Sequence, residues 1–123
     1  MLFRSVLKSG GREAITHYQV ERAFGPADRP LAARVACRLE TGRTHQIRVH
    51  LASKGAPCLG DPVYGSGSPA RAVQEAVREA GLERQALHAA LLGFVHPLTG
   101  QALRFETPLP QDMAMLQALL ADL

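Results

Sequence analysis

The sequence predicts one α+β domain over residues 1–123, mainly an antiparallel sheet with flanking helices. Three observations lead to this prediction. Two segments alternate apolar and polar side chains on either side of a turn rich in glycine and proline. Three further segments carry apolar side chains at helical spacing between helix start and stop signals. The length of 123 residues suits a single core and leaves little for a second one.

The first two strands are expected at residues 14–22 and 31–40, paired antiparallel across a turn. In the second strand, the odd-numbered side chains from Leu31 to Leu39 alternate with alanine or charged residues, which predicts one buried face. A third strand is expected at 87–95, buried on both faces. A turn after it leads to a fourth strand over the five residues from Ala102.

Residues 44–54 fit two patterns. Apolar side chains at every second position fit a strand, but Ile47 and Leu51 also pair at helical spacing. Thr44 as an N-cap and Gly55 just past the end favour a helix. We therefore predict a helix that is entered almost directly from the preceding strand.

Two more helices are predicted further along. The first spans about 69–80, with Ser68 as its N-cap and Gly81 just past its end. Its apolar stripe consists of Val73, Ala76, Val77 and Ala80. The last helix follows Pro110. Its packing side consists of Met113, Leu116, Leu119, Leu120 and Leu123.

The net charge of +3 is unevenly distributed. Residues 1–54 hold ten lysines and arginines against four acidic residues, whereas residues 55–123 hold four against seven. Twelve of the fourteen basic residues are arginine, whose planar fork suits phosphate groups. A basic half predicts a polyanionic partner, most simply a nucleic acid, and a solvated basic face is the alternative explanation.

Other chemistry is constrained by what the sequence lacks. No apolar run is long enough to span a bilayer, and the first eight residues do not resemble a signal peptide, so we expect a cytoplasmic protein with no membrane partner. Cys37 and Cys58 are expected to be reduced, buried thiols, with a single disulfide as the alternative. The histidines and cysteines show no metal-ligand spacing, so no metal site is predicted.

The chemically informative segment is 39–51, where a strand runs into a glycine turn and then into the predicted helix. Free N–H groups and the positive end of the helix dipole lie there, which favours an anion such as a phosphate or a carboxylate. Arg48 lies one turn beyond His45 on the same side, opposite the apolar packing residues, and can pair with a carboxylate. A capped helix with solvated arginines is the alternative interpretation.

Several motifs resemble RluA-type RNA pseudouridine synthases. Residues 39–52, LETGRTHQIRVHLA, resemble a signature of the second half of these enzymes. GDPVYG at 60–65 resembles their GDxxYG loop, LHAALLGFVHPLTG at 87–100 their hairpin, and FETPLP at 105–110 their closing segment. EAITHY at 13–18 is similar to their strand before the signature. These motifs occur in the expected order along nearly the whole chain, so together they are more specific than any one alone.

The resemblance implies an isomerase that converts uridine to pseudouridine in structured RNA, ribosomal or transfer RNA, without a cofactor. In this family a catalytic aspartate attacks the nucleoside, and the arginine of the HQIR segment, here Arg48, pairs with it. The residues expected to contact RNA are Arg38, Arg43, His45 and Gln46. The residues expected to have structural roles in the motifs are Asp61, Tyr64 and His88.

The chain departs from the family at one point. The family's aspartate lies in an HRLDxxTSG-like segment before the signature, and no such segment occurs among the 123 residues. RLETG at 38–42 resembles it only superficially, because it belongs to the arginine signature. Asp61 is the only aspartate near the motifs, and its place before Pro62 predicts a role in a turn. The chain is therefore predicted to be a single, partial pseudouridine synthase-like domain that is inactive alone.

Two functions remain open on this basis. One is an enzyme part whose activity needs residues outside this chain. The other is a non-catalytic module that binds structured RNA through Arg43, Arg48 and the basic half. A third function, binding an acidic protein, is disfavoured by the ordered motifs. An uncovered sheet edge and apolar face would also favour a dimer or association with a missing N-terminal half.

Overall fold

A computed structural model of the chain describes residues 5–8, 14–40, 44–65, 69–95 and 98–123, with the backbone alone at 5–8, 91–95 and 105. The elements in order are β1 (Ser5–Lys8), β2 (Ile15–Phe24), β3 (Ala32–Leu39), α1 (Gln46–Ser53), α2 (Arg71–Glu79), β4 (Leu91–Val95), β5 (Ala102–Glu106) and α3 (Gln111–Ala121). Antiparallel strands with three helices confirm the predicted α+β class.

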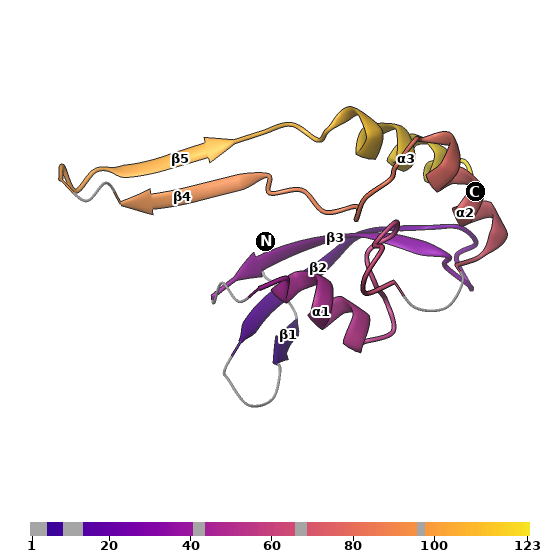
Figure 1. Cartoon of the computed structure of the whole chain (residues 1–123), viewed down its shortest axis with the longest axis horizontal. Coiled ribbons are helices and arrows are strands. Elements are labelled where there is room, and N and C mark those ends of the chain that lie inside the picture. Colours follow the sequence, from indigo (N-terminus) through magenta and orange to yellow (C-terminus); the bar gives the residue numbers. More distant parts are fainter. Residues whose placement is uncertain (1–4, 9–13, 41–43, 66–68, 96–97) are drawn as a thin grey trace.

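The strands form two separate sheets. β1, β2 and β3 form one sheet in that order, and β4 and β5 form a two-stranded hairpin. Figure 1 shows the hairpin extending as an arm on one side, while α2 and α3 lie together at the other end of the molecule. The predicted pairing of the first two strands is confirmed, with Thr16 opposite Leu39 and Phe24 opposite Ala32.

A β-bulge at Glu21 reverses which face of the sheet the side chains of β2 occupy. Val20 pairs with Val35, whereas Arg22 pairs with Arg34, so Glu21 is the extra residue. Side chains alternate between faces along a strand, and an extra residue shifts that alternation by one. Phe24 therefore lies on the face opposite to Thr16. Each face of β2 can then be covered by different helices.

The hydrophobic core lies on the Phe24 face of the sheet, where α2 and α3 pack against it. Its buried members are Phe24, Val73, Ala76, Leu82, Leu116 and Leu120. Leu31, just before β3, and Ala32, its first residue, pack against this cluster. The predicted stripes of the last two helices are confirmed, except that Leu123 lies beyond α3 and is 41% exposed.

The predicted buried face of the second strand is wrong in part. Val35 and Cys37 are half-buried, but Leu39 is 46% exposed. The core covers the Phe24 end of the sheet, and the register places Leu39 at the opposite end of β3. The core therefore packs against the other face, to which Ala32 belongs.

The third predicted strand is also wrong at its start. β4 begins only at Leu91, and residues 87–90 are irregular, with Ala89 and Ala90 exposed. The backbone of Ala90 is nevertheless paired, because its carbonyl accepts a hydrogen bond from the N–H of Thr107. The hairpin is thus preceded by an extended but non-strand segment. The strand predicted from Ala102 is confirmed as β5.

Candidate active site

The candidate site is built around α1, which lies between β2 and the loop at residues 56–65. Successive helical residues are turned by about 100°, so Gln46 and His50 lie on one side and Arg48 on nearly the opposite side. All three side chains are buried, whereas Ile47 is only half-buried. The expectation that apolar residues form the main packing side of this helix is therefore wrong. Polar side chains make its contacts both with β2 and with the loop at residues 56–65.

Gln46 and His50 attach α1 to β2 through Thr16. The side-chain amide of Gln46 donates to the carbonyl of Ile15 at 3.0 Å and to Oγ1 of Thr16 at 2.9 Å. Oγ1 of Thr16 also lies 2.8 Å from Nδ1 of His50. Thr16 is fully buried, so these bonds replace the water that its hydroxyl would otherwise contact. The three side chains fix the orientation of the helix on the sheet.

On the other side of the helix, Arg48 forms a bidentate ion pair with Asp61. Nε of Arg48 donates to Oδ2 of Asp61 at 2.8 Å, and Nη2 donates to Oδ1 at 2.8 Å. The Arg48 side chain is 9% exposed and that of Asp61 is 0% exposed. Parallel fork-to-fork hydrogen bonds of this kind combine charge with geometric specificity. The hydrogen bond with Asp61 also raises the pKa of Arg48 above its ordinary value, so the guanidinium stays charged.

Asp61 also closes the turn that follows it. Its Oδ1 accepts hydrogen bonds from the backbone N–H groups of Val63 at 2.9 Å and Tyr64 at 3.0 Å. The hydrogen bond from Arg48, opposed by burial and supported by the two backbone donors, holds the pKa of Asp61 well below its usual range. Four hydrogen bonds thus occupy the two carboxylate oxygens. This carboxylate thus lies buried in a turn, with its oxygens hydrogen-bonded within the chain.

Two glycines allow the loop to approach its neighbours. Gly60 has φ of +75°, and a Cβ there would lie 2.4 Å from the backbone oxygen of Arg84. A Cβ on Gly65 would lie 2.5 Å from the carbonyl oxygen of Asp61. Both contacts are too short for any side chain, so the GDPVYG spacing follows from the fold of the loop.

Tyr64 brings the loop into contact with the start of α1. Its hydroxyl lies 3.0 Å from Nδ1 of His45, and its ring centroid lies 5.1 Å from Cζ of Arg48. His45 is the N-cap residue of α1 and has a left-handed backbone with φ of 50°. The prediction of Thr44 as N-cap is therefore wrong. Thr44 is not the N-cap because His45, whose backbone is left-handed, comes between Thr44 and the first helical residue. The predicted proximity of His45 and Arg48 is confirmed, since both meet Tyr64.

The remaining predicted site residues lie elsewhere. Arg43 falls outside the described residues. Arg38 is exposed on β3 opposite His17, and the register places it on the sheet face away from α1. His88 lies with its Nε2 2.9 Å from Oγ1 of Thr107, beside the hairpin. Gln46 is 4% exposed and its amide is directed at β2, and its contact with RNA stays a prediction.

Thr16 and His50 were not among the site residues predicted from the sequence. The signal was present in principle, because Gln46 and His50 are four residues apart and Thr16 is a polar residue within a strand. A buried hydroxyl that contacts two side chains of a helix distant in the sequence can be recognised only when the position of that helix on the sheet is known. Thr16 and His50 are 34 residues apart in the chain.

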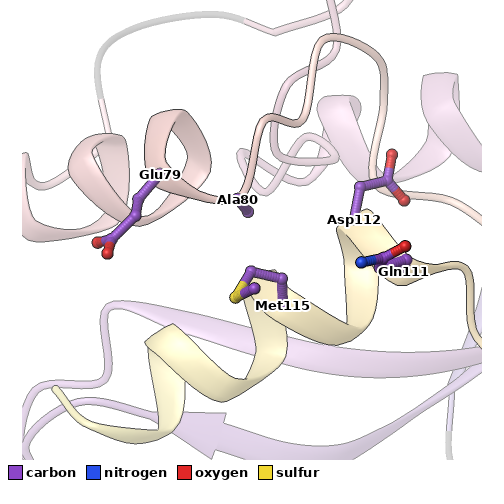
Figure 2. A pocket seen from close by; sticks show the side chains of 5 residues that line it. All are labelled: Glu79, Ala80, Gln111, Asp112 and Met115. Atoms are coloured by element: carbon purple, nitrogen blue, oxygen red, sulfur yellow. The ribbon is translucent and has the colours of Figure 1, made fainter.

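One hollow in the structure lies away from this site. A hollow of about 330 Å³ lies between α2 and α3 and is lined by Glu79, Ala80, Gln111, Asp112 and Met115. Figure 2 shows Met115 between Glu79 and Asp112, and none of the residues that line the hollow belongs to α1 or to the loop at residues 56–65.

Among the described residues, no cluster of histidine, cysteine and acidic side chains is arranged to hold a metal. Within that same part of the chain, no helix is both long and apolar enough to cross a membrane.

Comparison with known proteins identifies similar chains. The model of the RNA pseudouridylate synthase family matches residues 1–53, which include Arg48 and the Thr16 network. The ribosomal large subunit pseudouridine synthase D of Nitrosomonas europaea is 50% identical over 117 residues, 94% of this chain and 32% of that protein. The proteins of the same name from Zymomonas mobilis and Xanthomonas campestris are 47% and 43% identical, over 86% and 97% of this chain and 31% and 35% of their own lengths. The chain thus spans about a third of the length of these relatives.

Proposed function

The chain belongs to the RluA-type RNA pseudouridine synthase family, and we propose that it supplies the arginine part of an enzyme that isomerises uridine to pseudouridine in ribosomal or transfer RNA. In this proposal the attacking carboxylate comes from residues outside these 123. The observation that supports it most directly is the state of Arg48, whose guanidinium is buried, charged and held at one edge by Asp61.

The remaining edge of Arg48 suits a second carboxylate. Asp61 occupies Nε and Nη2, and among the described residues no hydrogen bond from Nη1 of Arg48 is recorded. A guanidinium carries five N–H donors, so a second anion can bind at the Nη1 end while Asp61 stays in place. An incoming aspartate at that end would be kept ionised by the opposite charge.

The reaction requires such an ionised carboxylate. In the isomerisation, the bond between N1 of uracil and C1′ of the ribose breaks, and a bond forms between C5 and C1′. The hydrogen on C5 is released to solvent, and N1 gains a proton, so no cofactor or co-reactant is consumed. The target base also has to leave its stack to reach a protein side chain. The ten lysines and arginines within residues 1–54 would favour binding of the RNA backbone.

A non-catalytic RNA-binding module is the second candidate. One observation favours it: the aspartate in contact with Arg48 is Asp61, whose oxygens already accept four hydrogen bonds.

The proposed location of the protein is the cytoplasm, where ribosomal and transfer RNA are found. A partner polypeptide or a second copy that supplies the carboxylate remains part of the proposal.

The two candidates are separated by measuring tritium release from RNA that carries 5-tritiated uridine. The chain alone is measured first, and then a hybrid in which the chain replaces the matching third of the Nitrosomonas europaea relative, to which it is 50% identical. The catalytic proposal expects release by the hybrid, loss of release on Arg48→Ala, and no release by the chain alone. A folded hybrid that binds RNA without releasing tritium would support the non-catalytic module. Release by the chain alone would contradict both candidates.

A further inference from the structure

We infer that Tyr64 is a positioning residue for the proposed reaction, because Cζ of Arg48 lies over its ring and this contact keeps the free edge of the guanidinium aimed at an incoming carboxylate. This inference rests on the proposed function for its catalytic meaning. The geometry on which it depends lies within this chain and can be tested separately.

The guanidinium of Arg48 is restrained in its plane but needs a further contact to fix the tilt of that plane. The two hydrogen bonds to Asp61 hold the Nε and Nη2 edge at 2.8 Å each. Because Arg48 reaches Asp61 along a flexible side chain, tilting about that edge would swing Nη1 through the widest arc. An aromatic ring that attracts the cation resists this tilt, and the centroid of the Tyr64 ring lies 5.1 Å from Cζ of Arg48.

Tyr64 is itself held on three sides. Its backbone N–H donates to Oδ1 of Asp61, so the same carboxylate fixes both the arginine edge and the start of the tyrosine. Its hydroxyl lies 3.0 Å from Nδ1 of His45, and the two rings meet edge to face with centroids 5.6 Å apart. The left-handed backbone of His45 places its ring beside the loop, at the entrance of α1. A non-glycine residue in that conformation is uncommon and calls for a compensating contact.

These contacts separate two roles within one residue. The backbone of Tyr64 belongs to the turn and is kept by any substitution except proline. The ring of Tyr64, in contrast, contacts the guanidinium of Arg48. Replacing the ring therefore changes the restraint on the guanidinium without removing the turn that Asp61 closes. Tyr64→Leu removes the ring, and Tyr64→Phe keeps the ring but loses the hydroxyl that contacts His45.

The test uses the 123-residue chain labelled with ¹⁵N at arginine side chains. The first readout is the hydrogen-exchange rate of the Arg48 Nε–H, and the second is the shift of the Arg48 signals on titration with acetate, a small carboxylate. Tyr64→Leu is expected to speed exchange at least tenfold and to weaken acetate binding severalfold. Tyr64→Phe should stay within about threefold of the unchanged chain in both readouts. Tyr18→Leu is the matched control, because Tyr18 lies with its ring 5.9 Å from the ammonium of Lys54, a separate tyrosine–cation pair.

The inference is overturned if Tyr64→Leu leaves both readouts unchanged, or if Tyr64→Phe changes them as strongly as Tyr64→Leu. In the hybrid enzyme, Tyr64→Leu should lower kcat with little change in KM for RNA, and Tyr64→Phe should restore most of the loss. The two proposals fail in different ways. If Arg48 responds to Tyr64 in the chain but the hybrid never releases tritium, the proposed reaction is wrong and the positioning role of Tyr64 stands.

Discussion

The carboxylate of Asp61 binds the guanidinium of Arg48 along its Nε and Nη2 edge, with both N···O distances at 2.8 Å. The same carboxylate accepts the backbone N–H groups that form the turn after it. One side chain therefore links the loop at 56–65 to α1. The guanidinium of Arg48 is therefore oriented by a carboxylate of the same chain.

The first prediction concerns the acid side of the stability profile. The pKa of Asp61 is depressed in the folded chain, so its pairing contributes stability that is present above the ordinary pKa of about 3.9 and is lost as the pH falls. The advantage of the unchanged chain over Asp61→Asn should therefore be full above about pH 5 and shrink below about pH 4. Urea unfolding of both chains between pH 7 and pH 2 measures this difference.

The control for that series is Glu75→Gln, which removes the exposed i,i+4 pair with Arg71 at 3.3 Å. Because such surface pairs contribute about 0–1 kcal/mol, Glu75→Gln should change the unfolding free energy little at any pH. A difference between Asp61→Asn and the unchanged chain that stays constant from pH 7 to pH 2 would contradict the role given to the ion pair.

Substitution of Thr16 tests the attachment of α1 to β2. Thr16→Val keeps the shape but removes the oxygen that accepts from Gln46 and lies beside His50. Because these buried groups then lack a partner, the unfolding free energy should fall by about 1–3 kcal/mol. Thr16→Ser keeps the oxygen and loses one methyl group, so its loss should be nearer about 0.8 kcal/mol. Equal losses for the two variants would mean that packing, and not the hydroxyl, holds the helix.

Two left-handed glycines provide a matched pair for the loop. Gly60 and Gly55 have similar φ values of +75° and +78°, but only a Cβ at Gly60 would meet a neighbour, the backbone oxygen of Arg84. Gly55→Ala should therefore cost only the strain of a left-handed residue, roughly 1–2 kcal/mol. Gly60→Ala should cost clearly more and should also disturb the Arg48 signals. Thermal unfolding of the two variants gives the comparison, and a smaller loss at Gly60 would show that the loop moves away freely.

The reactivity of the two thiols provides a further prediction. Burial and the nearby Cys58 raise the pKa of Cys37 to about 11, and burial also raises the pKa of Cys58. Because the thiolate is the reactive form, alkylation of Cys37 by iodoacetamide at pH 8 should be about a hundredfold slower than in the urea-unfolded chain. The raised pKa also means that stability falls as the pH rises from about 8.5 toward 11. Mass spectrometry of each cysteine over time measures the rates, and equal rates in the folded and unfolded chain would contradict the burial.

Local signals in the sequence predicted much of the fold. Gly55 and Gly81 follow α1 and α2 with positive φ, as their positions after apolar repeats indicated. The apolar stripe of α2 was also visible, because Val73 and Ala76 repeat at helical spacing and face the core. These features depend on neighbours within one or two turns of the chain, which the sequence displays directly.

The site was less predictable because its contacts join separate elements. Arg48 was predicted on the side of the helix opposite its apolar packing residues and able to pair with a carboxylate, since the helix was oriented by its apolar residues alone. In the structure its partner Asp61 comes from a loop, and Gln46 faces a strand that lies 30 residues earlier. The bulge at Glu21 had no signal in the alternation pattern, yet it decides that Phe24 faces α2 and α3.

The short separation of Arg48 and Asp61 in the sequence has a consequence for how the site forms. The two residues are 13 positions apart, and α1 continues to Ser53 within that interval. Closing so short a loop costs little chain entropy, and contacts between nearby residues form early during folding. The arginine can thus be oriented by its own neighbourhood before distant segments of a longer polypeptide arrive. An attacking carboxylate supplied by those segments would then meet a receptor that is already assembled.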